Sequence, residues 1–437
     1  MLLDNLQTIM FFHKGRRNMK RLAFLFPGQG SQFVGMGKQF YDNYKVAKDV
    51  FEEASDTLGL DFVKLCFDSA SDELARTENT QPAILTMSVA AYKLYMELIG
   101  FQPAYAAGHS LGEFSALTCA GVITFADALQ IVRQRGIFMQ EAVAEEIGAM
   151  CAIIGMRQEI VEEECKKFSE SDRIAVISNY NSPQQTVISG HRKAVNSVAK
   201  QLEDRGARVS FLRVSAPFHS PLMEPAACKL HQELLTYKYN QFDFPVISNV
   251  SGRPYRDDSE VIETLTAQMT SPVRWNESMQ YLVQMGINHF VELGPQNILT
   301  KLLKDNEQIV SLAFGKIQDV ELAKKVFEIE MMSNTSNGEQ KNLITKCLAA
   351  AVCTKNNNWD NEAYRSGVIE SYKKIEQIQQ KIDLYDHFPT VEELKEAIYL
   401  LKTIFETKQV PLQEQQERFK EILEQTGTTS LFSDILS

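Results

Sequence analysis

The stretch Ala106-Ala107-Gly108-His109-Ser110-Leu111-Gly112-Glu113-Phe114 holds a serine between two glycines in the pattern G-x-S-x-G. This spacing is typical of a nucleophile elbow, in which a strand turns sharply into a helix and lifts the serine hydroxyl above a sheet. Glycines relieve crowding where the strand and the helix pass close together. The flanks agree, because an extended run over 103–107 precedes the serine and an Ala/Leu-rich helical pattern over 111–120 follows it. G-x-S-x-G also occurs by chance, so the motif alone does not establish that Ser110 is a nucleophile.

The composition is that of an ordinary globular protein, and the 437 residues suit two or three domains. The net charge of −11 argues against nucleic acid as a partner, although docking depends on local patches rather than on net charge. No apolar run has the length of a membrane-spanning helix, so we expect no membrane partner. The cysteines are odd in number and form no C-x-x-C pair, which predicts free thiols in a reducing cytoplasm. They are Cys66, Cys119, Cys151, Cys165, Cys228, Cys347 and Cys353.

The elements predicted along the chain form an α/β body with a smaller subdomain inserted in it. A strand over 21–26 leads into Phe26-Pro27-Gly28-Gln29-Gly30-Ser31-Gln32, where the glycines and the proline mark a tight loop. This loop is either a plain turn or a strand end that presents a backbone amide to a site. It does not fit a phosphate-binding loop, because no Gly-Lys-Ser/Thr follows. Residues 149–214 take the order β-α-β-β-α-β, the signature of a ferredoxin-like fold, so we predict the body at 19–148 and 215–332.

The two ends of the chain differ from the body. Residues 1–18 are interpreted as a disordered or marginal arm, and we hypothesise that Met19 is the natural start. The polar residues 333–340 predict a linker. Residues 341–437 predict an all-helical extension whose apolar stripes serve packing, and they show no catalytic constellation. The helices are expected over 340–353, 361–382, 391–407 and 412–425.

A serine nucleophile needs a base within hydrogen-bond distance. His109 adjoins Ser110, but neighbouring side chains of a strand point to opposite faces, so a structural role is predicted for it. His219 follows a proline-bearing strand exit in Ser215-Ala216-Pro217-Phe218-His219-Ser220, where such loops reach a site, and the pattern leaves a structural role equally open. The other histidines stand in tail, helix or surface contexts and are discounted. They are His13, His191, His231, His289 and His387.

Four features together resemble malonyl-CoA:acyl-carrier-protein transacylases, including the acyltransferases of polyketide synthases. They are FPGQGSQ at 26–32, GHSLGE at 108–113, Arg135 on a predicted helix over 125–144, and PFHS at 217–220. The resemblance covers about Met19 to Leu303, two thirds of the chain. It implies an α/β-hydrolase-like large subdomain with the inserted ferredoxin-like small subdomain. The all-helical C-terminal extension resembles that of free-standing acyltransferases that serve polyketide synthases in trans.

The resemblance implies a role for each residue that matches a motif. Ser110 matches the nucleophile and His219 its base, with the backbone carbonyl of Gln268 orienting the imidazole. The amides of Gln29 and Leu111 match the oxyanion hole, which stabilises the tetrahedral intermediate.

Two further residues match those that select the substrate. Arg135 matches the clamp for the substrate carboxylate, although an arginine on a helix is more often solvent-exposed. Phe218 matches a residue that crowds an α-methyl branch and so favours malonyl over methylmalonyl groups. Here Pro217 stands between Ala216 and Phe218, a departure from the A-F-H pattern.

The implied reaction moves a malonyl group from malonyl-CoA through a serine ester to the phosphopantetheine thiol of an acyl carrier protein. The resemblance implies no cofactor and no metal, with polyketide synthase modules as further partners. Docking of an acidic carrier protein would need a local basic patch, for which the small subdomain and its junctions offer several residues. They are Lys166, Lys167, Arg192, Lys193, Arg205 and Arg208.

Two alternatives remain at this point. One is an acyl hydrolase of the same fold that removes stalled acyl groups from carrier proteins, which would not need the clamp that Arg135 matches. The other is a non-catalytic docking module for carrier proteins, in which the helical extension carries the partner surface. The intact Gln29, Ser110 and His219 argue against that second alternative.

Overall fold

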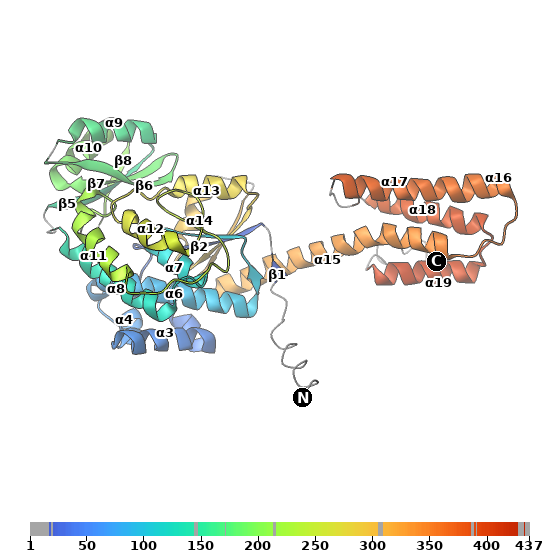
Figure 1. The fold of residues 1–437 in the computed structure, drawn as a ribbon, viewed down its shortest axis with the longest axis horizontal. Helices are drawn as coiled ribbons and strands as arrows, with labels where there is room; N and C mark the ends of the chain where they lie inside the picture. The colour runs from blue at the N-terminus through green and yellow to red at the C-terminus, as the bar shows by residue number, and fades with distance from the viewer. Residues whose placement is uncertain are drawn as a thin grey trace. The chain divides into compact units, whose positions relative to one another are not determined.

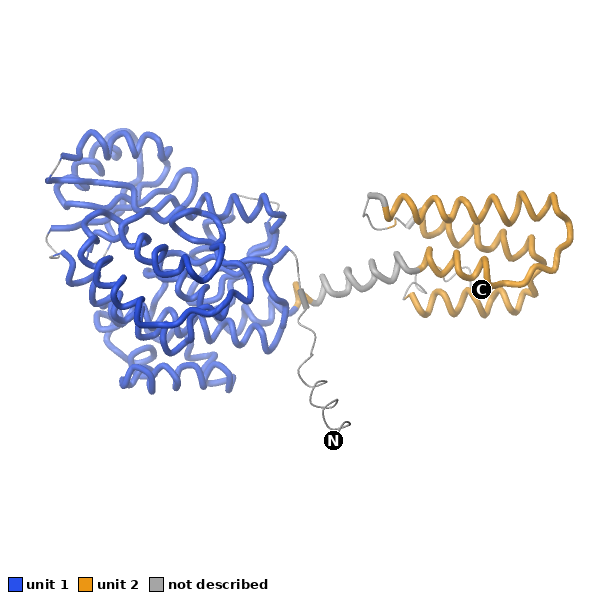
Figure 2. The backbone as a smooth tube through the Cα atoms, viewed as in Figure 1, with its two compact units in different colours: residues 1–324 blue, residues 325–437 orange. Residues whose placement is uncertain are grey.

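The computed structural model describes residues 17–18, 21–143, 147–170, 172–212, 216–304, 309–385, 389, 391–426 and 432, with the backbone alone described over 17–18, 328–342, 384–385 and 391–392. The chain divides into two compact units, Met1–Lys324 and Lys325–Ser437 (Figure 2). No helix in the described part of the chain combines the length and the hydropathy needed to span a bilayer.

The first unit is built on a five-stranded parallel sheet in the order β11-β10-β2-β4-β9. The strands are β2 (Leu22–Phe26), β4 (Tyr105–Gly108), β9 (Val246–Ile247), β10 (His289–Leu293) and β11 (Val310–Phe314). Every residue of β2 is buried, as expected for a parallel sheet that is covered on both faces. Phe26 pairs with Gly108, so the loops that follow β2 and β4 emerge side by side at one edge of the sheet. This edge is where parallel α/β sheets place their sites.

Helices cover both faces of this sheet. Ala23 and Leu25 pack in one apolar cluster with Trp275, while Phe24 points the other way and meets the ring of Tyr95 edge-on at 5.0 Å. The helices of the large subdomain are α2 (Lys38–Asn43), α3 (Lys45–Leu58), α4 (Phe62–Phe67), α5 (Ser71–Ala75), α6 (Thr77–Leu98), α7 (Leu111–Cys119), α8 (Phe125–Glu141), α11 (Glu224–Leu234), α12 (Val261–Gln268), α13 (Trp275–Gln284) and α14 (Ile298–Leu302), with short turns η1 (Pro221–Met223) and η2 (Asp258–Glu260).

The small subdomain has the predicted ferredoxin-like fold. Its antiparallel sheet has the order β6-β7-β5-β8, with α9 and α10 packed on one face (Figure 1). Along β5, Cys151 and Ile153 point into that helix-covered core, whereas the alternate residues Met150 and Ala152 line a pocket on the other face. The elements are β5 (Gly148–Ile154), α9 (Gln158–Phe168), β6 (Ala175–Ser182), β7 (Gln185–His191), α10 (Arg192–Asp204) and β8 (Arg208–Phe211).

The second unit is helical, as predicted, and has an apolar core of its own, which includes Leu343, Ile398, Phe405 and Leu423. Its helices are α16 (Asn361–Ala363), the π-helical turn η3 (Tyr364–Ile369), α17 (Glu370–Tyr385), α18 (Val391–Thr407) and α19 (Leu412–Gln425). The bounds of α18 and α19 are those expected from the sequence, because two clear apolar stripes define them.

The predicted boundary between the units differs from the structure. Residues 333–340, predicted as a linker, continue as helix within α15 (Ile317–Cys353), and the division of the chain falls earlier, between Lys324 and Lys325. The sequence of α15 contains no proline, and its single glycine, Gly338, costs only about 1 kcal/mol in a helix interior. Polar composition alone therefore does not end this helix.

The predicted N-terminal arm is described only at its end. Arg17–Asn18 form β1, which pairs in parallel with β3 (Phe101–Gln102). The remainder of the predicted arm, residues 1–16, and the hypothesised start at Met19 lie outside the described residues.

Candidate active site

Ser110 stands at the turn between β4 and α7 with φ 53° and ψ −104°, a conformation that residues with a side chain rarely adopt. A Cβ atom at Gly108 would lie 1.9 Å from the carbonyl carbon of Gly112, and one at Gly112 would lie 2.0 Å from the carbonyl oxygen of Phe26. Only glycine fits at these two positions. The motif therefore forms the sharp elbow that its spacing predicts.

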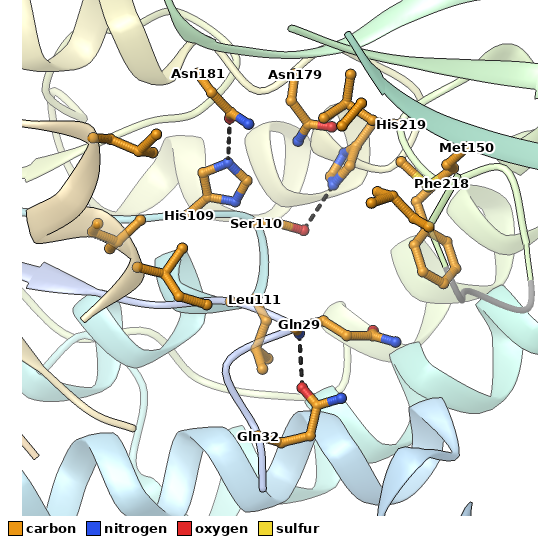
Figure 3. A pocket seen from close by; sticks show the side chains of 18 of the residues that line it. Gln29, Gln32, His109, Ser110, Leu111, Met150, Asn179, Asn181, Phe218 and His219 are labelled. Carbon is orange, nitrogen blue, oxygen red and sulfur yellow. Dashed lines mark hydrogen bonds between the residues drawn. The ribbon is translucent and has the colours of Figure 1, made fainter. Parts of the chain in front are cut away.

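Ser110 and His219 point toward each other in the pocket (Figure 3). Ser110 Oγ lies 2.7 Å from His219 Nε2, and His219 Nδ1 lies 2.8 Å from the backbone carbonyl oxygen of Gln268. A carbonyl can only accept, so Nδ1 carries the hydrogen and Nε2 presents its lone pair to the serine. Burial, helped by the charge of Arg135, lowers the pKa of His219 to about 3. The imidazole is thus neutral at pH 7 and can accept a proton from the hydroxyl.

The backbone amides of Gln29 and Leu111 lie at the loop after β2 and at the first residue of α7, and both residues line the same pocket as Ser110. The first amides of a helix have no acceptor within it. No described residue accepts a hydrogen bond from either amide. Because the two loops are neighbours at the sheet edge, this pair of N–H groups can stabilise negative charge beside the serine.

Arg135 is only 1% exposed, so it is not the solvated helix residue that its sequence context alone would favour. Its Nη1 donates to Gln81 Oε1 at 2.9 Å, and its Nη2 donates to Gln268 Oε1 at 2.9 Å and to Ser110 Oγ at 3.3 Å. Its Nε has no hydrogen-bond partner among the described residues. Burial lowers its pKa to about 10, which leaves it a cation at neutral pH. A buried cation that lines the pocket beside Ser110 suits an anionic ligand.

Several residues of the site were missed from the sequence. Asn249 holds the elbow from both sides, since its Oδ1 accepts from the amide of Ser110 at 2.7 Å and its Nδ2 donates to the carbonyl of Gly108 at 2.6 Å. Glu113 is fully buried beneath the serine, and Gln81 lies against Arg135. A charged residue within the apolar pattern of α7 was a signal for Glu113. Asn249 gave none.

His109 turns away from the serine, in line with the structural role predicted for it (Figure 3). Its Nε2 lies 2.9 Å from Asn181 Oδ1, and its ring packs 5.5 Å from that of Trp275. Burial lowers the pKa of His109, so it also stays neutral. His109 thereby ties the elbow to β6 of the small subdomain.

The pocket around Ser110 has a volume of about 460 Å³ and is walled by both subdomains. Met150 and Val187 come from the small sheet, and Leu299 comes from α14 of the large subdomain. Phe218 lies beside Met150 at the wall and is 6% exposed (Figure 3). Within the described part of the chain, no three His, Cys, Asp or Glu side chains gather where they could hold a metal ion.

This fold and site define a serine-dependent acyl-transferring enzyme, and comparison with known families agrees. The model for the acyl transferase domain matches residues 23–326. The chain belongs to this family.

Its relatives include malonyl CoA-acyl carrier protein transacylases. One from Bacillus subtilis is 43% identical over 398 residues, which cover 91% of this chain and 99% of the relative. One from B. subtilis strain 168 is 42% identical and covers 71% of this chain and 99% of the relative. A solved complex of a type II polyketide synthase acyl-carrier protein with its malonyl-transacylase matches with a TM-score of 0.68 and 39% identity, over 69% of this chain and 98% of that one. The first match is long enough to extend into the helical unit.

Proposed function

We propose that the protein transfers a malonyl group from malonyl-CoA to the phosphopantetheine thiol of an acyl carrier protein. One observation carries the proposal: a Ser110–His219 pair oriented by the carbonyl of Gln268 shares a pocket with the buried cation Arg135. The relatives named malonyl CoA-acyl carrier protein transacylases support it.

In the first half-reaction, Ser110 Oγ attacks the thioester carbonyl while His219 Nε2 takes the hydroxyl proton. The amides of Gln29 and Leu111 stabilise the oxyanion of the tetrahedral intermediate. When the C–S bond breaks, His219 returns the proton to the coenzyme A sulfur, which leaves a malonyl ester on Ser110.

In the second half-reaction, the carrier thiol gives its proton to His219 and attacks the ester carbonyl. The C–O bond to Ser110 breaks, and the proton returns to Oγ. Hydrolysis by water competes with this step, and the walls from both subdomains limit its access. The proposed cycle requires no cofactor, since the phosphopantetheine belongs to the carrier.

Selection of the acyl group falls to Arg135 and Phe218. The guanidinium lines the pocket, and its planar fork of N–H donors matches the geometry of the malonyl carboxylate. Phe218 crowds an α-methyl branch and so favours malonyl over methylmalonyl groups. A hydrolase for stalled acyl chains would not need a buried cation, and a docking module would not need the Ser110–His219 hydrogen bond.

For the pathway, we propose a free-standing acyltransferase that serves polyketide synthase modules in trans, in the cytoplasm. The helical unit supports this, because it resembles the extension of such acyltransferases. The first B. subtilis relative covers 91% of this chain, so its match extends into the helical unit. The strain 168 relative covers only 71% of this chain, although 99% of its own length is matched. The seven cysteines are free, which suits a reducing compartment.

The substitution Ser110→Ala tests the proposed function. The variant should form no covalent malonyl adduct, because the hydroxyl that His219 activates is gone. Intact-mass spectra after incubation with malonyl-, methylmalonyl- and acetyl-CoA report adduct formation, selectivity and hydrolysis together. A malonyl adduct of normal yield on the alanine variant would refute the assignment of Ser110.

A further inference from the structure

Glu113 is a fully buried carboxylate one turn into α7, directly beneath the elbow. It accepts three hydrogen bonds, from Tyr255 Oη at 2.6 Å, from Gln268 Nε2 at 2.6 Å and from the amide of Asn249 at 3.2 Å. Asn249 and Tyr255 belong to the segment that follows β9, and Gln268 is the last residue of α12. Burying a charged carboxylate costs free energy even when it accepts hydrogen bonds, and the mechanism above gives Glu113 no role.

Glu113 is linked to Arg135 through a single amide group. Gln268 Oε1 accepts from Arg135 Nη2 at 2.9 Å, and Gln268 Nε2 donates to Glu113 at 2.6 Å. A guanidinium can only donate, so the oxygen of Gln268 must face Arg135 and its NH₂ must face an acceptor. The carboxylate of Glu113 is that acceptor. The carboxylate of Glu113 thus balances the charge of Arg135 without occupying any N–H donor of the guanidinium.

The charge balance changes when an anionic substrate enters. In the empty pocket, one carboxylate stands against one guanidinium, and both are buried. A malonyl carboxylate at Arg135 adds a second negative charge without a second cation. Like charges that share a buried site raise each other's affinity for protons, so one of them is driven to the neutral form.

We propose that Glu113 takes up a proton when the malonyl carboxylate reaches Arg135 and releases it when the malonyl group leaves. The inference rests on the proposed malonyl transfer and adds a charge-regulating residue to it. The substrate carboxylate keeps its charge because it binds the guanidinium directly, whereas Glu113 is held only by neutral donors.

The titratable surroundings of Glu113 support this assignment. Burial raises the pKa of Glu113 to about 7, and hydrogen bonds from Tyr255 and Gln268, with the charge of Arg135, oppose that rise. Tyr255 lies after β9 and Arg135 on α8, and they are the titratable groups that act on Glu113. His219 has its pKa lowered to about 3 and stays neutral, so it does not compete for the proton.

Proton uptake can be measured apart from activity. Formation of the serine ester moves the hydroxyl proton to the coenzyme A sulfur, so the reaction itself consumes no proton. Stoichiometric enzyme mixed with malonyl-CoA in weakly buffered solution with a pH indicator should take up close to one proton per adduct at about pH 8. The uptake should shrink toward about pH 6, where Glu113 is already protonated in the empty pocket, and acetyl-CoA should cause none.

Glu113→Gln keeps the size of the side chain and removes its titration, so uptake should vanish while a malonyl adduct still forms. Tyr255→Phe removes a donor to the ionised form, which raises the pKa of Glu113 and should move the uptake profile to higher pH. Glu292→Gln is the matched control, because Glu292 is equally buried but accepts from the amides of Leu299 and Thr300 instead. It should keep wild-type uptake.

Two outcomes overturn the inference: a wild-type adduct that forms without uptake at about pH 8, or uptake that persists in Glu113→Gln. If Glu113→Gln does not fold, an unshifted profile in Tyr255→Phe overturns it as well. Failure of the proposed function looks different, since the wild-type protein would then give no malonyl adduct in the mass spectrum.

Discussion

Gln268 serves the site with its backbone and its side chain at once. Its carbonyl holds His219, while its side-chain amide contacts Arg135, Glu113 and the carbonyl of Ser110. The motif resemblance implied only the contact between the Gln268 carbonyl and His219. Such a contact depends on the path of the backbone and is the same for any residue type. The side-chain role depends on Glu113 and Arg135, which are distant in sequence. It became visible only with the fold.

At the same scale, Arg135→Ala should abolish most malonyl transfer and retain or increase transfer from acetyl-CoA. Removing one partner of a buried charge pair costs about 2–5 kcal/mol, or roughly thirty- to several-thousand-fold in rate. Steady-state kcat/KM for both acyl-CoA substrates measures the change. An unaltered malonyl-to-acetyl preference would contradict the role given to the guanidinium.

At the scale of elements, the contact between β2 and α7 depends on glycine. Gly112→Ala would place a Cβ 2.0 Å from the carbonyl oxygen of Phe26, so the elbow cannot close without moving β2. We expect a loss of about 3 kcal/mol or more in the free energy of unfolding, measured by denaturant titration.

Ser115→Ala on the same helix is the control for that change. The hydroxyl of Ser115 is buried and has no hydrogen-bond partner among the described residues, so its removal should leave stability nearly unchanged or raise it. If Gly112→Ala is as stable as Ser115→Ala, the steric explanation for the motif is wrong.

Most elements could be predicted from periodicity, and the exceptions have local causes. Strand β9 ends after Ile247, because the amide of Ser248 bonds to the carbonyl of Arg253 and Asn249 is bound to the elbow. Helix α15 runs through the expected linker because nothing there breaks a helix. For β9 the deciding information lies in contacts with other segments, whereas for α15 it was present in the sequence, because the predicted linker contains no proline.

At the scale of the molecule, the charge of −11 means that an acidic carrier protein would need a local docking patch. Lys167 and Arg205 both pair with Glu164, at 2.8 Å and 2.7 Å, which partly neutralises two of the candidate cations. Arg192 and Lys193 begin α10 and are exposed. They follow His191, which pairs with Gly148 near the pocket residue Met150.

Reversing both residues, Arg192→Glu with Lys193→Glu, should therefore raise the apparent KM for carrier protein and leave serine malonylation by malonyl-CoA nearly normal. The defect should shrink with added salt, since exposed charges are largely screened beyond about 10 Å at 0.1 M. The matched control is Lys45→Glu with Lys48→Glu on α3, which contributes no residue to the pocket wall. An unchanged KM at low salt would direct the search for docking to the helical unit.

Ser110 and His219 both have positive φ angles, 53° and 54°, so both residues of the reacting pair have strained backbone conformations. Such strain amounts to about 1–3 kcal/mol per residue and must be outweighed by packing elsewhere in the fold. Ser110→Gly relaxes it and Ser110→Ala does not, although both lack the hydroxyl. Calorimetry should give the glycine variant the higher melting temperature by roughly 2 °C, and equal values would show that no strain is stored. A higher melting temperature in the glycine variant than in the alanine variant would show that any side chain at this turn is kept at a cost in stability, so selection for stability alone would favour glycine over the serine that catalysis requires.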